Sequence, residues 1–134
     1  MKEMIYQAQR KVEILFEGEH LDHKFAILNL GTHPTAYVEC KIADCHDYGD
    51  ERLDNIQVHF GFTFFGDAYW NEQDKKKYLG WDYAHYCDYS GYYAKDPVMA
   101  DMGGKQWTTS EIYNEVKSVI EQLVALENTL NNAG

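Results

Sequence analysis

Alternating apolar and polar side chains fill three stretches in the first third of the chain, a pattern typical of half-buried β-strands. These stretches cover residues 11–17, 24–30 and 35–42, and the last is the most regular. A polar turn at 18–23, whose histidines we expect to be exposed, joins the first two stretches into a β-hairpin. The chain is therefore expected to begin with a β-sheet.

The second half of the chain predicts two more strands and a long helix. Residues 56–66 and 78–83 show strand-like alternation. Apolar side chains then recur every three or four residues between Ile112 and Leu130, so one stripe of this helix faces a core. Thr108 and Glu111 have the spacing of a capping box, in which the two residues satisfy each other's backbone N–H groups at the start of a helix.

Together these elements predict an α+β fold, a twisted and mainly antiparallel sheet with one long C-terminal helix packed on it. A chain of 134 residues has the size of a single domain, so we expect residues 1–134 to form one unit. Two loops are expected to be exposed: 44–55, which is rich in aspartate, and 67–77, which carries a run of lysines.

The formal net charge of −10 restricts the partners that the protein can have. A negative surface repels phosphate backbones, so we expect no direct nucleic-acid binding, whereas a basic protein surface or a metal cation would be attracted. The three cysteines show no paired-motif spacing, and unpaired thiols are typical of a reducing compartment. No apolar run approaches the ~18 residues of a membrane span, so the sequence predicts a cytoplasmic protein that does not enter a membrane.

The predicted strand at 56–66 and the segment after the next strand carry polar side chains of the kind that bind ligands. Alternation places His59 and Thr63 on one face, and Asp82 would share that face if residues 78–83 pair alongside. Glycines at 61 and 80 would let a ligand or another backbone approach closely. The candidate ligand-binding residues are His59, Thr63, Asp82, His85, Tyr86 and Asp88.

This cluster is compatible with three kinds of chemistry. A divalent ion such as zinc, manganese or iron, the one cofactor that these residue types suggest, could be held by His59, Asp82, His85 and Asp88. Asp82 could instead orient a histidine for general-base work. The third interpretation is a structural hydrogen-bond network that satisfies buried polar groups. Trp81 and the tyrosines from Tyr83 onward could stack a planar ligand or fill the core.

Three motifs occur together in the chain: His-Pro-Thr-Ala-Tyr-Val at 33–38, Val-His-Phe-Gly-Phe-Thr at 58–63 and Gly-Trp-Asp-Tyr-Ala-His at 80–85. With Asp88 and the C-terminal helix, they resemble a family of small uncharacterised proteins that are common in phage and prophage genomes. The family motifs are His-Pro-x-Ala-Tyr-Val, Val-His-Gly-Gly-x-Thr and Gly-Phe-Asp-x-Ala-His. Phe60 replaces the first family glycine, and Trp81 and Tyr83 also depart from the commoner pattern. The resemblance implies a phage accessory protein that works in a bacterial host, without an established reaction.

Small size, acidity and the tyrosine-rich polar cluster favour a non-enzymatic binding module, and the resemblance adds a role against a bacterial defence system. Its partner would be a nucleotide-like small molecule bound at the cluster, or a host protein bound by the acidic surface. The competing hypothesis is a divalent-metal-dependent enzyme, similar to a hydrolase, that uses the His/Asp cluster. The sequence identifies neither the ligand nor whether the chain forms a homo-oligomer.

Overall fold

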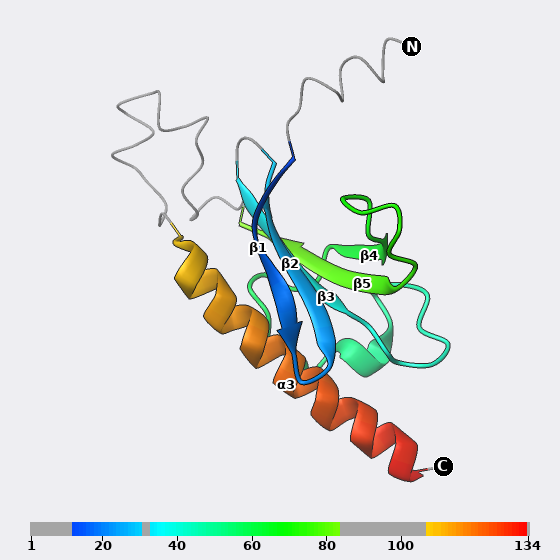
Figure 1. The fold of residues 1–134 in the computed structure, drawn as a ribbon. Helices are drawn as coiled ribbons and strands as arrows, with labels where there is room; N and C mark the ends of the chain where they lie inside the picture. The colour runs from blue at the N-terminus through cyan, green and yellow to red at the C-terminus, as the bar shows by residue number, and fades with distance from the viewer. Residues whose placement is uncertain (1–11, 31–32, 84–106, 134) are drawn as a thin grey trace.

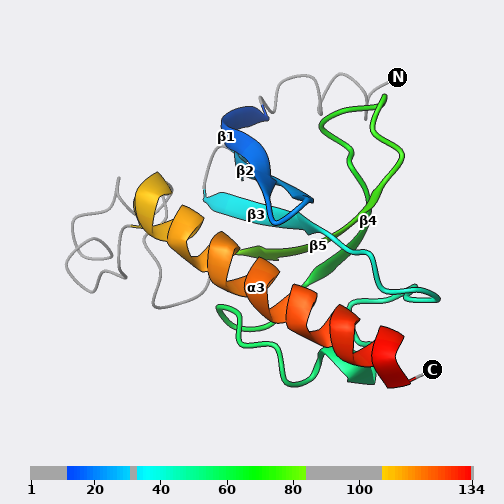
Figure 2. The same cartoon turned by 60° about the horizontal axis from the view of Figure 1, so that its bottom comes forward.

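The described part of the chain forms a five-stranded sheet in which every neighbouring pair is antiparallel (Figure 1). The structure is a computed structural model that describes residues 12–30, 33–83 and 107–133. The strand order is β1-β2-β3-β5-β4, and a long helix crosses one face of the sheet (Figure 2). The elements are β1 (Glu13–His20), β2 (His23–Asn29), β3 (Pro34–Glu39), the 3-10 helix η1 (Glu51–Leu53), β4 (Phe64–Asp67), β5 (Lys77–Asp82) and α3 (Thr109–Ala133). This arrangement confirms the predicted α+β fold.

The face of the sheet under α3, which we call the helix face, holds the larger core. Val116, Val119 and Leu123 of α3 are fully buried there, at the three- and four-residue spacing seen in the sequence. The capping box is confirmed, because the N–H of Glu111 donates to Thr108 Oγ1 and the N–H of Thr108 donates to Glu111 Oε1, both at 3.1 Å. The strand side chains in this core are Phe25, Ile27, Ala36, Val38, Leu79 and Trp81.

The opposite face of the sheet, which we call the loop face, is covered in part by residues that follow β4. Ala68 is buried, and the ring of Trp70 packs against Tyr37 and Tyr78, with centroid distances of 4.6 and 5.1 Å. The sequence predicts an exposed loop at 67–77, and this prediction is wrong for buried Ala68 and half-buried Trp70, whereas Tyr69 is exposed. The rings of the loop fold back because the loop face of β3 and β5 offers apolar partners, and β3 is therefore buried on both faces.

The β1–β2 hairpin closes with a tighter turn than the one predicted at 18–23. Leu21 and Asp22 have φ values of 49° and 64°, the left-handed pair that a two-residue type I′ turn requires. His23, which the sequence predicts to be exposed, is only 2% exposed. Its Nδ1–H donates to the carbonyl of Leu21 and its Nε2–H donates to Glu127 Oε2, both at 3.0 Å. His23 therefore ties the hairpin to α3.

The strand predicted at 56–66 is largely wrong. Only the segment from Phe64 onward is a strand, because a turn at Phe60 and Gly61, with φ values of 55° and 83°, interrupts the alternating residues. The N–H of Gly61 closes this turn by donating to the carbonyl of Val58 at 3.0 Å. Alternation overestimates the strand because side-chain polarity does not register a left-handed backbone at a residue such as phenylalanine.

Candidate functional site

His59, the first candidate ligand-binding residue, belongs to a packed network on the helix face. Its ring stacks on Tyr83 at a centroid distance of 4.7 Å and an interplanar angle of 17°, and Trp107 lies 4.9 Å from it. Its backbone N–H donates to Glu115 Oε2 at 2.7 Å. The other carboxylate oxygen of Glu115 accepts a hydrogen bond from Tyr83, whose hydroxyl also accepts from Trp81 Nε1 at 2.9 Å. These contacts support the structural interpretation for this part of the cluster.

Thr63 and Asp82 meet at the other face of the sheet. Thr63 Oγ1 donates to Asp82 Oδ2 at 3.4 Å, and the N–H of Thr63 donates to the carbonyl of Gly80 at 2.8 Å. Side chains alternate along β5, so Asp82 points to the loop face, whereas Tyr83 belongs to the helix-face core. The structure thus brings Thr63 and Asp82 together and places the ring of His59 on the opposite side of β5.

The remaining candidates, His85, Tyr86 and Asp88, lie outside the described residues, so their part in the site stays a prediction. The metal hypothesis needs two of them, His85 and Asp88, beside His59 and Asp82. Within the described ranges, no three His, Cys, Asp or Glu side chains form a group that could hold a metal ion. The described residues therefore give the metal site no direct support.

The space near β5 that the sequence offers to a ligand is filled by side chains. A Cβ atom on Gly80 would lie 2.5 Å from Cδ1 of Tyr37, so this glycine accommodates the tyrosine ring of the neighbouring strand. Trp81 and Tyr83 are 1% and 0% exposed and belong to the helix-face core. For Trp81 and Tyr83, core filling is therefore the interpretation that the structure supports, and the tyrosines that follow lie outside the described residues.

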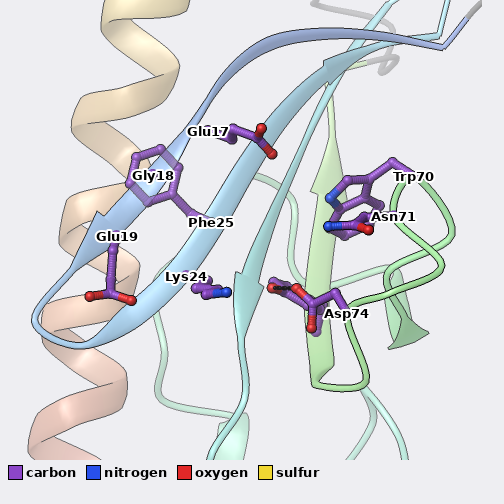
Figure 3. A pocket seen from close by; sticks show the side chains of 9 residues that line it. Glu17, Gly18, Glu19, Lys24, Phe25, Trp70, Asn71 and Asp74 are labelled. Carbon is purple, nitrogen blue, oxygen red and sulfur yellow. Dashed lines mark hydrogen bonds between the residues drawn. The ribbon is translucent and has the colours of Figure 1, made fainter.

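A hollow of about 400 Å³ opens on the loop face, between the β1–β2 hairpin and the segment that follows β4 (Figure 3). Glu17 and Glu19 project from β1, and Trp70 and Asp74 face them from across the hollow. Its volume falls in the range of small-ligand pockets, roughly 300–1,000 Å³. We call this site the acidic hollow, and its lining residues are Glu17, Gly18, Glu19, Lys24, Phe25, Trp70, Asn71, Asp74 and Tyr78.

The hydrogen bonds of the acidic hollow keep its inner carboxylate ionised. Partial burial of Asp74 opposes the charge, but hydrogen bonds from the Tyr78 hydroxyl, at 2.5 Å, and from the N–H of Lys76 outweigh it and lower the pKa of Asp74. Burial and the same contact raise the pKa of Tyr78, which stays a neutral donor. Glu17 and Glu19 are exposed. Among the described residues, the lining therefore presents three carboxylates against the single ammonium group of Lys24.

This arrangement is suited to holding a cation. Carboxylates at Glu17, Glu19 and Asp74 attract positive charge, and the half-buried ring of Trp70 supplies a π face for a cation or for an alkyl stem. Binding is the chemistry that these residues support.

Sequence reasoning missed the acidic hollow because its walls come from segments that are far apart in the chain. Two local signals point to it in retrospect. Glu17 and Glu19 flank a glycine at alternate positions of β1, and so lie on one face. The pair Tyr69–Trp70 is a large aromatic surface within an otherwise polar loop, which indicates that this part of the loop packs on something.

Comparisons with protein-family models, with curated proteins and with solved structures give no match. None of the described helices has an apolar run long enough to cross a bilayer. A function for this chain is therefore inferred from its own residues.

Proposed function

We propose that this protein is a non-enzymatic binding module that holds a lysine- or arginine-bearing segment of a partner protein at the acidic hollow. The observation that carries the proposal is the described lining of the hollow, in which three carboxylates and one ammonium group lie beside the ring of Trp70. A basic side chain fits both features, because its charge pairs with carboxylates and its stem or planar head packs on aromatic rings.

A nucleotide-like ligand fits the same site less well. Its phosphates would meet the carboxylates of Glu17, Glu19 and Asp74, and Lys24 is the one cation among the lining residues that the structure describes. The net charge of −10 adds long-range repulsion. We therefore favour a protein partner over a nucleotide. The resemblance to phage proteins suggests a bacterial host protein as that partner, and a role against host defence is part of the same proposal.

Electrostatic attraction gives the proposal a measurable signature. A strongly negative surface steers a basic partner toward the hollow and raises its association rate at low ionic strength. At 0.15 M salt the Debye length is about 8 Å, so the attraction between exposed charges is largely screened beyond the contact itself. Affinity for a basic segment should therefore fall as salt is added, mainly through a slower association rate.

Calorimetric titration with short peptides tests the proposal. The probe is a peptide of about eight residues that alternates lysine and valine, and its counterpart alternates glutamate and valine. We expect the lysine peptide to bind and the glutamate peptide not to bind. The double substitution Glu17→Gln/Glu19→Gln should weaken binding of the lysine peptide about fivefold, since each rim charge pair contributes roughly 0.2–1 kcal/mol.

The matched control is the double substitution Glu51→Gln/Asp54→Asn, which removes the same charge around η1. Leu53 of η1 belongs to the helix-face core, whereas the acidic hollow opens on the loop face, so the control substitutions lie away from the hollow. We expect the control to change affinity less than twofold. Equal losses in the two double variants would show that the peptide follows overall charge, and the absence of binding by the lysine peptide would overturn the proposal.

A further inference from the structure

Strand β1 forms an edge of the sheet that no other described strand covers. It pairs with β2 on one side, and the sheet order places it at the end, where no described residue pairs with its other side. Every residue from Glu13 to Glu19 is exposed, including Phe16 at 41%. The other edge strand, β4, spans only Phe64–Asp67. An exposed strand edge of this kind is a template for pairing with another extended chain.

The register of the hairpin shows which backbone groups face outward from β1. Glu19 lies opposite Lys24, and the N–H of Lys24 points away from β1, toward Glu39, whose Oε1 accepts it at 3.1 Å. Glu19 and Lys24 therefore form a non-hydrogen-bonded pair, and so do Glu17 and Ala26, two residues along the ladder. The N–H and C=O groups of Glu17 and Glu19 point to the outer edge.

The side chains of these two residues also line the acidic hollow. Glu17 and Glu19 thus offer backbone hydrogen bonds at the outer edge of β1 and negative charge on its loop face. Phe16, which directly precedes Glu17 in β1, lies on the helix face, where its ring contacts Phe25 and Tyr113 at centroid distances of 5.5 and 5.0 Å. An added strand would therefore meet carboxylates on one face and an aromatic surface on the other.

Charge decides which chain can occupy this edge. A second copy of the protein would place the glutamates of one β1 near those of the other, since Glu13, Glu17 and Glu19 are spread along the strand. Such like-charge pairing disfavours a homodimer through this edge. A strand with basic residues at alternate positions would instead place each positive side chain beside a carboxylate, with an apolar residue near Phe16.

We propose that the partner's basic segment binds as an extended strand along the outer edge of β1, with alternate lysine or arginine side chains on the loop face at the acidic hollow. This inference rests on the proposed function and adds the mode of binding. The irregularity in the β1–β2 register between Ile14 and Phe16 limits regular pairing to the part of β1 that includes Glu17 and Glu19.

Backbone methylation of the lysine–valine peptide tests the proposal with charge held constant. A paired strand uses the N–H groups of every second residue, whichever its direction. N-methylation of the alternate residues that face β1 should abolish binding, and N-methylation of the other residues should leave affinity within about threefold. The two peptides carry the same number of methyl groups and the same charge, and we expect only one of them to bind.

Hydrogen exchange reports the contact from the side of the protein. Saturating peptide should slow exchange of the Glu17 and Glu19 amides at least about tenfold, because both become hydrogen-bonded. The substitution Glu17→Pro removes an outward N–H, a position where an edge strand tolerates proline. It should weaken peptide binding about fivefold more than Glu17→Gln, which removes the charge alone.

Three results separate this inference from the proposed function. Binding by only one methylated peptide, with protected amides at Glu17 and Glu19, supports both. Equal binding by all three peptides without amide protection, or equal weakening of the two methylated peptides, overturns edge pairing while the binding function stands. No binding by the unmethylated peptide overturns the binding function, and edge pairing with it.

Discussion

The contact between His23 and Glu127 should make the stability of the fold depend on pH in a defined direction. Burial of the His23 ring opposes its charge, but hydrogen bonds to Glu127 and to the Leu21 carbonyl outweigh it and raise the pKa of His23 above its ordinary value of 6.5. A raised pKa in the folded state means that folding favours the protonated ring. The stabilisation is fully present below about pH 6.5 and is lost as pH rises through the folded-state pKa.

The substitution Glu127→Gln removes the negative charge and keeps the shape of the side chain. The side chains of His23 and Glu127 are 3% and 13% exposed, so solvent screens their contact little. A hydrogen bond between charged groups contributes roughly 1.5–3 kcal/mol and a neutral one roughly 0.5–1.5 kcal/mol, so the free energy of unfolding should fall by about 1.5 kcal/mol at pH 5.5. At pH 9 the neutral ring accepts from the new amide, and the difference should approach zero.

Urea denaturation at pH 5.5, 7 and 9 measures these free energies of unfolding. The control is Glu121→Gln, the same chemical change on the same helix, at the partner of half-buried His20. That contact is 3.2 Å long, but Glu121 is 59% exposed, so its loss should cost less than about 0.5 kcal/mol at every pH. A Glu127→Gln deficit that is the same at pH 5.5 and pH 9 would refute the charged contact.

Three further substitutions and one control test the packing, the helix cap and a buried hydrogen-bond network through urea denaturation at pH 7. Gly80→Ala should lower the free energy of unfolding by about 2 kcal/mol, because its Cβ would clash with the ring of Tyr37. The control Gly66→Ala meets only an ordinary contact at 3.4 Å and should cost less than about 0.5 kcal/mol. Equal losses in the two variants would contradict the clash. Thr108→Ala should cost about 1 kcal/mol through loss of the cap, and no loss would show that the capping box is dispensable. Tyr83→Phe should cost about 2 kcal/mol by leaving its partners unsatisfied, Glu115 among them, and a neutral effect would remove that network from the account.

The sequence predicted the elements whose burial follows a regular period. The stripe from Ile112 to Leu130 and the capping box at Thr108 identified α3, and alternation identified β2, β3 and β5 to within a few residues. Both patterns are local consequences of packing one face of an element against a core, so a single sequence is enough to detect them. The α+β class followed directly.

The errors share a physical cause, which is that long-range packing does not leave a local pattern. Alternation extended the strand that ends in β4 through Phe60, whose left-handed backbone is set by a turn. His23 looked like an exposed turn residue, but it is buried and hydrogen-bonded to Glu127, which lies more than 100 residues later in the sequence. Trp70 lies in a polar loop, yet packs on β3 and β5.

The candidate site was predicted only in part for the same reason. Thr63 and Asp82 do meet, as alternation on adjacent strands indicated. His59 does not join them, because the chain turns between it and Thr63 and leaves its ring stacked on the helix-face residue Tyr83. The acidic hollow forms where the β1–β2 hairpin lies opposite the segment after β4, and no local spacing in the sequence predicts that these two segments are close in space.

Backbone NMR of the labelled protein during titration with the lysine–valine peptide shows whether a basic segment binds at the acidic hollow. We expect the largest shift changes at the amides of Glu17, Glu19 and Lys24 and at the indole N–H of Trp70. The buried indole of Trp81 should stay unchanged and serves as an internal reference. Saturating changes at these groups would support binding at the acidic hollow. Shift changes that centre on α3 or η1 while these signals stay still would contradict it.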